Sequence, residues 1–148
     1  MAQVRTEFPH GIRVVENVFV PLPDGTRLAA KLWLPEGAGR VPAVLEYLPY
    51  RKRDGTRTRD QGLHAWLAGH GYAGVRVDIR GTGDSEGVLE DEYTEREQLD
   101  GCDVIAWIAA QDWCDGQVSM IGISWGGFNG LQIAARRPPA LRSVITVG

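Results

Sequence analysis

The sequence predicts an α/β fold in which a mostly parallel sheet carries an antiparallel hairpin at its N-terminal end. Two observations support this prediction. The chain opens with two alternating, β-branched segments joined by a turn, and short apolar runs then alternate with segments of helical spacing. Apolar strands that alternate with helices are typical of a parallel sheet covered on both faces. We therefore expect about six strands and three helices.

The hairpin is expected over residues 12–34. Its strands are predicted at 12–20 and 27–34, where apolar and polar residues alternate. Between them, prolines fix φ and Asp24-Gly25 has the composition of a tight turn.

Four further strands and three helices follow the hairpin. The strands are expected at 42–48, 72–79, 118–123 and 143–147, and the helices at 61–68, 97–110 and 125–136. In the second helix Val104, Ile105, Trp107 and Ile108 form one apolar stripe, as in a helix packed on a sheet. We find no internal repeat and no interdomain linker.

Composition excludes several classes of function. The 148 residues include 16 Lys and Arg and 19 Asp and Glu, and this weak acidity gives no general reason to bind nucleic acid or anionic lipid. No apolar run reaches the roughly 18–20 residues of a membrane-spanning helix. Because residues 1–8 lack the apolar centre of a secretion signal, we expect a cytoplasmic protein without nucleic-acid or membrane partners.

The cysteines and histidines do not form a familiar metal-binding pattern. Cys102 lies in a helical segment and Cys114 just beyond it, which favours small buried thiols and leaves a disulfide as the alternative. Two cysteines and three scattered histidines do not match a zinc-ligand spacing. We expect neither a metal nor a cofactor.

The most informative motif is Gly122-Ile123-Ser124-Trp125-Gly126, a G-x-S-x-G pattern between a predicted strand and a predicted helix. A serine on such a sharp turn is lifted out of the sheet, and crowding requires glycine two residues before and after it. The helix N-terminus favours developing negative charge. We therefore predict that Ser124 is a nucleophile and that the Trp125 N–H donates to an oxyanion.

A second G-x-S-x-G is centred on Ser85. It follows a loop, and its acidic neighbours Asp84 and Glu86 would oppose the formation of an alkoxide. We interpret Ser85 as a turn residue in a solvated acidic loop.

Two further patterns each have a structural and a functional interpretation. The G-x-G-x-x-G at 69–74 precedes a strand, so a helix C-cap is favoured over a dinucleotide site. The basic run at 51–60 contains aspartates but no aromatic residue, so a solvated loop is favoured over a nucleic-acid patch. From composition alone, Tyr50 is either structural or a hydroxyl donor at the end of a strand.

Five ordered blocks together resemble the cocaine esterase/NonD group of α/β-hydrolases, which is related to the X-prolyl dipeptidyl peptidases. The blocks are residues 23–30, 49–54, 71–87, 100–108 and 122–128. The resemblance implies an α/β-hydrolase fold, Ser124 as the nucleophile, and the Tyr50 hydroxyl with the Trp125 N–H as the oxyanion hole. The group usually carries tyrosine after the nucleophile, and Trp125 changes that side chain. Asp78 and Arg80 are interpreted as salt-bridging or loop-fixing residues.

In this fold the acid and the histidine of the triad follow the nucleophile. Residues 125–148 contain no Asp, Glu or His, and we expect surface or satisfied polar roles for His10, His64 and His70. We therefore expect residues 1–148 to be the N-terminal portion of one catalytic domain, inactive alone, without its cap, its acid and histidine or any C-terminal domain.

The resemblance implies esters, X-Pro peptides or β-lactam side-chain amides as alternative substrates. The alternative is a non-catalytic binding module. In either case an exposed apolar edge strand at 143–147 predicts self-association.

Overall fold

The computed structural model describes residues 7–148, and in them six strands and three helices confirm the predicted α/β architecture. In chain order these are β1 (Ile12–Pro21), β2 (Arg27–Pro35), β3 (Val41–Leu48), α1 (Arg57–Gly69), β4 (Ala73–Asp78), α2 (Glu95–Ala109), β5 (Cys114–Ile123), α3 (Trp125–Ala135) and β6 (Leu141–Val147).

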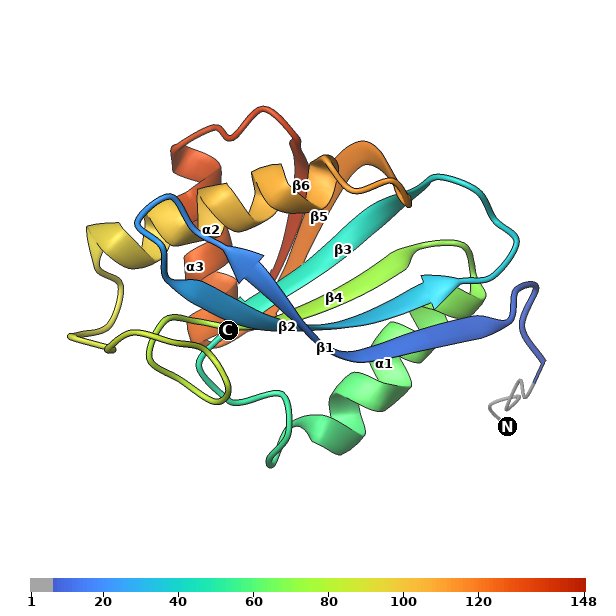
Figure 1. The fold of residues 1–148 in the computed structure, drawn as a ribbon, viewed down its shortest axis with the longest axis horizontal. Coiled ribbons are helices and arrows are strands. Elements are labelled where there is room, and N and C mark those ends of the chain that lie inside the picture. The colour runs from blue at the N-terminus through green and yellow to red at the C-terminus, as the bar shows by residue number, and fades with distance from the viewer. Residues whose placement is uncertain (1–6) are drawn as a thin grey trace.

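The strands form one twisted sheet in the order β1-β2-β4-β3-β5-β6 (Figure 1). The pairs β1/β2 and β2/β4 are antiparallel, and the three remaining pairs are parallel. The predicted hairpin turn is closed by a hydrogen bond from the Thr26 N–H to the Asp24 carboxylate (3.0 Å) and by Gly25 at φ 88°. The mostly parallel sheet with an antiparallel hairpin is therefore confirmed.

The helices cover opposite faces of this sheet. The Tyr47 hydroxyl donates to the Glu97 carbonyl of α2 (3.0 Å), whereas the adjacent Glu46 pairs with Arg59 of α1. Because neighbouring strand residues point to opposite faces, α1 and α2 lie on opposite sides of β3 (Figure 1). Helix α3 packs beside α2, where Ile133 lies against Gly101.

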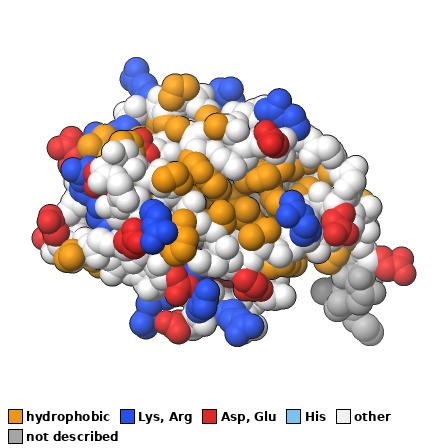
Figure 2. All heavy atoms as spheres, in the orientation of Figure 1, with side chains coloured by type: hydrophobic (Ala, Val, Ile, Leu, Met, Phe, Trp, Pro, Cys, Tyr) orange, Lys and Arg blue, Asp and Glu red, His pale blue; other side chains and the backbone are white. Residues whose placement is uncertain are grey.

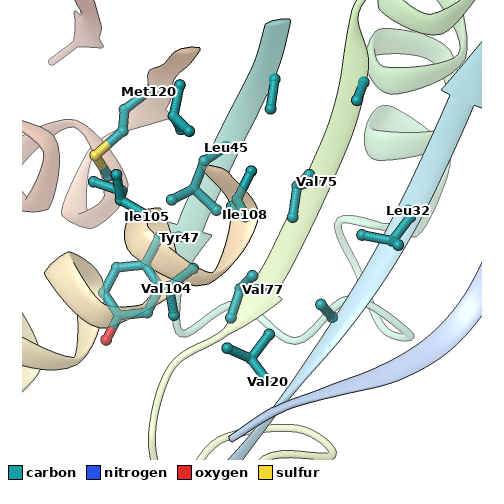
Figure 3. Packing of buried hydrophobic residues seen from close by; sticks show 14 of the residues in the cluster. Val20, Leu32, Leu45, Tyr47, Val75, Val77, Val104, Ile105, Ile108 and Met120 are labelled. Atoms are coloured by element: carbon teal, nitrogen blue, oxygen red, sulfur yellow. The ribbon is translucent and has the colours of Figure 1, made fainter. Parts of the chain in front are cut away.

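The face beneath α2 and α3 holds the apolar core. The predicted stripe of α2 packs there, with Val104, Ile105 and Ile108 fully buried. Figure 3 shows these side chains pointing toward Leu45, Val75 and Val77 of the sheet. The burial of this stripe is the main link between α2 and the strands that carry the site.

The face beneath α1 is ionic instead. Glu46 and Arg76 are register partners on β3 and β4, and the Arg76 Nε lies 3.0 Å from the Asp60 carboxylate of α1. All three side chains are buried. The solvated loop predicted for 51–60 is therefore wrong in two respects: α1 already begins at Arg57, and Lys52 and Asp60 are buried in ion pairs.

The glycines at 69–74 end a helix, as predicted. The Gly71 N–H donates to the Ala68 carbonyl and the Tyr72 N–H to the Leu67 carbonyl, while Gly71 has φ 89°. This pair of bonds is the Schellman arrangement of a helix C-terminus.

The cysteines are free, with Cys114 buried and Cys102 half-buried, and burial raises the pKa of both thiols.

No group of three or more potential metal-ligating side chains occurs within residues 7–148. In the same range, no helix has the length and apolar character needed to cross a membrane. Most of the segment examined for a secretion signal, residues 1–6, lies outside the described part of the chain.

On the face shown in Figure 2, hydrophobic side chains gather centrally, with charged groups mainly around them.

Candidate active site

Ser124 occupies a strained turn between β5 and α3. Its backbone angles are φ 53° and ψ −119°, a region that residues with a Cβ rarely adopt. The Ser124 N–H donates to the Val147 carbonyl (2.8 Å), and its own carbonyl accepts the Phe128 N–H (3.0 Å). The side chain is exposed and does not cap α3. The turn therefore presents the hydroxyl to solvent at the carboxyl edge of the sheet.

Both elbow glycines are required by close packing. A Cβ on Gly122 would overlap the main chain of Gly126 and lie 2.7 Å from the Gly127 nitrogen. A Cβ on Gly126 would lie 2.8 Å from Cδ2 of Leu48 on β3. Glycine at 122 therefore lets the main chain turn sharply into α3, and glycine at 126 avoids displacing the buried Leu48 side chain, as the motif predicts.

Tyr50 and Trp125 lie together beside the serine. Tyr50 follows β3, and β3 and β5 are parallel neighbours, so their carboxyl ends share one edge of the sheet. The Trp125 main-chain N–H donates to the Tyr50 hydroxyl at 3.4 Å, across 75 residues of sequence. Two hydrogen-bond donors, the phenol O–H and the peptide N–H, thus lie next to one another at the start of α3.

The segment that carries Tyr50 is held by the end of β4. Arg51 has φ 58°, and the following Lys52 N–H donates to the Asp78 carboxylate at 2.7 Å. The buried Lys52 ammonium also pairs with Asp78 (3.6 Å) and with Asp84. Asp78 therefore fixes this loop, which is the structural role expected for it.

Arg80 is likewise structural. Its guanidinium bonds to Asp100 (2.7 Å), Asp24 (2.8 Å) and the Thr26 hydroxyl (2.7 Å), which ties the hairpin turn to α2.

Two residues that the sequence reasoning missed surround the Trp125 side chain. The indole N–H donates to the buried Glu97 carboxylate (2.7 Å), and the Tyr93 ring packs on the indole with centroids 5.2 Å apart. Partial burial and the nearby Glu92 raise the pKa of Tyr93, and Tyr50 and Glu97 act in the same direction. The capping-box pattern Thr94-x-x-Glu97 was the available signal for Glu97.

Ser85 lies outside this arrangement. Its hydroxyl donates to the Asp78 carbonyl (2.6 Å) and accepts the Ala29 N–H (2.8 Å). The neighbouring Glu86 pairs with Arg27, and Asp84 pairs with Lys52 and Arg53. The turn role is confirmed, but the loop is fixed by hydrogen bonds and ion pairs rather than freely solvated.

The three histidines lie toward the amino ends of the parallel strands, away from Ser124. His70 precedes β4, and its Nδ1 donates to the Trp66 carbonyl (2.7 Å). The His10 N–H donates to the Gly69 carbonyl. His64 is fully buried against Gly74 at the start of β4, with Nε2 3.3 Å from Glu46 and its ring stacked on Trp33. Its placement excludes a surface role, and one ring nitrogen has no partner.

Within residues 7–148, the candidate site thus combines an exposed serine with two neighbouring hydrogen-bond donors at a helix N-terminus, and none of the histidines contacts it. Such an arrangement can stabilise a tetrahedral intermediate, but general-base activation of the serine requires a further group.

Comparisons with known proteins find similar sequences and folds among hydrolases. The cocaine esterase of Rhodococcus sp. (strain MB1 Bresler) is 38% identical over 133 residues, which are 88% of this chain and 23% of that protein. A CocE/NonD family hydrolase from Staphylococcus aureus superimposes with a TM-score of 0.80 at 24% identity, over 90% of this chain and 27% of that one.

An α-amino acid ester hydrolase superimposes with a TM-score of 0.74 at 26% identity, over 97% of this chain and 26% of its own. The chain therefore spans about a quarter of the length of these relatives. Its six-stranded sheet with three helices corresponds to an incomplete α/β-hydrolase fold. The profile of the X-Pro dipeptidyl-peptidase (S15) family matches residues 24–147, and the chain belongs to that family.

Proposed function

We propose that this chain carries the nucleophile and the oxyanion hole of a serine hydrolase that cleaves carboxylic esters or amides through an acyl-enzyme. One observation carries the proposal: the Tyr50 hydroxyl and the Trp125 N–H meet at 3.4 Å beside the exposed, strained Ser124. Membership of a family of esterases and peptidases supports the same chemistry.

In the proposed reaction the Ser124 Oγ attacks the substrate's carbonyl carbon while a base takes its proton. The carbonyl oxygen becomes an oxyanion, which accepts hydrogen bonds from the Tyr50 O–H and the Trp125 N–H. Collapse of this intermediate breaks the bond to the alcohol or amine, which leaves with the proton, and an acyl-serine remains. Water then attacks the acyl carbon and releases the acid.

We further propose that residues 1–148 alone turn over poorly. No Asp, Glu or His follows Ser124 in this sequence, and the three upstream histidines lie away from Ser124, near Glu46, Trp66 and Gly69. Loss of triad members costs on the order of 10⁴–10⁶ in rate in related machinery. The relatives' names cover cocaine, α-amino acid esters and X-Pro peptides, so the proposed substrate class is an ester or amide of a carboxylic acid.

Labelling with a fluorophosphonate, followed by mass spectrometry of the labelled peptide, tests this proposal. We expect slow labelling of the 148-residue chain at Ser124, and fast labelling when the chain is extended along its reading frame to include a downstream acid and histidine. Ser124→Ala should abolish labelling. Ser85→Ala, the matched variant at the other G-x-S-x-G, should leave the labelling rate unchanged.

Two outcomes would contradict the proposal. Labelling that persists in Ser124→Ala would place the nucleophile elsewhere, and rapid labelling of the 148-residue chain would refute its inactivity. If the extended chain stays unlabelled and folded, a non-catalytic module becomes the better description.

A further inference from the structure

Glu97 connects helix α2 to the residue after the nucleophile. It is the third residue of α2 and only 4% exposed. One carboxylate oxygen accepts the Tyr93 N–H (3.0 Å) and the other accepts the Trp125 indole N–H (2.7 Å). An ordinary capping glutamate bonds back only to the start of its own helix. Glu97 bonds with one oxygen to Tyr93, the residue just before the N-cap Thr94, and reaches the elbow with the other.

The indole bond restrains the residue that supplies the oxyanion N–H. The main chain of Trp125 is fixed by the elbow at one end, and its side chain is fixed by a buried charge at the other. Hydrogen bonds to ionised acceptors are stronger than neutral ones. Tyr93 adds a second restraint, because its ring packs on both Trp125 and Phe128, with centroids 5.2 and 4.7 Å apart.

We propose that Glu97 is a positioning residue of the oxyanion hole: through the indole of Trp125 it holds the Trp125 peptide N–H beside the Tyr50 hydroxyl, where both groups can donate to one oxyanion. The inference rests on the proposed function, because the oxyanion role of that N–H is part of it. A glutamate that merely capped α2 would affect stability and leave the environment of Trp125 unchanged.

Nitrogen-15 NMR of the chain separates these two roles. The chain has five tryptophans, and the Trp125 indole signal is identified by its loss in Trp125→Phe. In Glu97→Ala we expect this indole N–H to exchange with solvent about tenfold faster or more, because a charge-assisted hydrogen bond is lost. The main-chain amide signals of Ser124 and Trp125 should move as well.

Three variants make the test specific. Thr94→Ala removes the hydroxyl that accepts the Glu97 N–H (3.2 Å) but leaves the carboxylate in place, and Glu95→Gln changes an exposed acid in the same turn. Both should leave the Trp125 indole signal unchanged. Trp125→Phe should move the amide signals of residues 124 and 125 as Glu97→Ala does, and combining the two changes should add nothing. If Glu97→Ala does not fold, Glu97→Gln, which removes the charge from the acceptor, provides the comparison at the indole signal, and Trp125→Phe provides it at the main-chain amides.

The inference is overturned if Glu97→Ala lowers the melting temperature but leaves the Trp125 signals in place, or if Thr94→Ala moves them equally. The proposed function can fail separately. If Ser124 never reacts with fluorophosphonate in the extended chain while the NMR coupling holds, the link between Glu97 and Trp125 stands and the hydrolase proposal falls.

Discussion

At the scale of single residues, the strained backbone of Ser124 depends on its glycine neighbours. Ser124 can keep φ 53° because Gly122 and Gly126 let β5, α3 and Leu48 approach closely. A strained residue persists only where its surroundings over-determine it. An added methyl group at Gly122 of the elbow therefore overlaps the main chain directly.

We predict that Gly122→Ala destabilises the chain by about 2–3 kcal/mol, because its Cβ would overlap the main chain of Gly126, which cannot rotate away. Urea unfolding monitored by circular dichroism measures this change. Gly55→Ala is the matched control, since no atom lies within 4 Å of the added Cβ there. Equal stabilities of the two variants would contradict the packing argument.

The acidic loop after β4 gives a prediction about pH. The hydrogen bond from Lys52 lowers the pKa of Asp84 below its ordinary value of 3.8, and Arg53 acts in the same direction. Because the folded-state pKa is the lower one, this stabilisation is complete above the unfolded pKa and is lost as the pH falls through the folded value. The loss therefore lies below pH 3.8.

Asp84→Asn should accordingly be less stable than the parent at about pH 6, and the difference should shrink as the pH falls below the ordinary carboxyl range. Free energies of unfolding measured across that range check this. Ser85→Ala loses two hydrogen bonds but no charge, so its difference from the parent should not depend on pH. A constant difference for Asp84→Asn would count against the ion pair.

At the scale of elements, α1 is attached to the sheet mainly by charge. Its buried Asp60 accepts from Arg76, which is also fully buried. Removing Asp60 takes away the nearest carboxylate of Arg76, since Glu46 and Asp78 both lie 3.8 Å away, and weakening a buried ion pair is more costly than losing an exposed one.

We therefore expect Asp60→Ala to lower the free energy of unfolding by about 3 kcal/mol. Asp54→Ala, which removes an exposed ion pair with Arg51, should change it by less than about 1 kcal/mol. Denaturant titrations of both variants make the comparison, and a loss of similar size in both would refute the burial argument.

This ionic layer also marks the limit of what the sequence predicted. All six strands and three helices were located because the burial periodicity that defines them is local. The start of α1 was placed four residues late and the start of β5 at residue 118 instead of Cys114. At these ends, residues are stabilised by partners distant in sequence: Asp60 by Arg76, and Cys114 by its pairing with Val41.

The same distinction applies to the site. Ser124, Trp125 and the two glycines lie in one short motif, and Tyr50 was recovered through the family resemblance. Glu97 was missed because it precedes Trp125 by 28 residues, and only the packing of α2 beside α3 brings the two together. Local patterns therefore predicted Ser124 as the candidate nucleophile, whereas the contacts that hold Trp125 in place are found only in the tertiary structure.

At the scale of the whole molecule, the two edges of the sheet differ. In the described chain, β6 forms one edge and exposes Ile145 (57%) and Val147 (48%). The other edge, β1, has a register irregularity between Val15 and Val18. Bulges protect an edge strand from pairing with another chain, whereas a regular apolar edge favours such pairing.

We therefore predict that the 148-residue chain self-associates through β6 as its concentration rises. Ile145→Lys should reduce the apparent mass measured by light scattering, because a charge on this strand opposes edge-to-edge pairing. Val14→Lys places the same charge on the opposite edge strand and should leave the association unchanged. A parent chain that stays monomeric at high concentration and melts cooperatively would show that the β6 edge does not mediate self-association. If both lysine variants dissociate the assembly equally, net charge rather than the β6 edge controls the association.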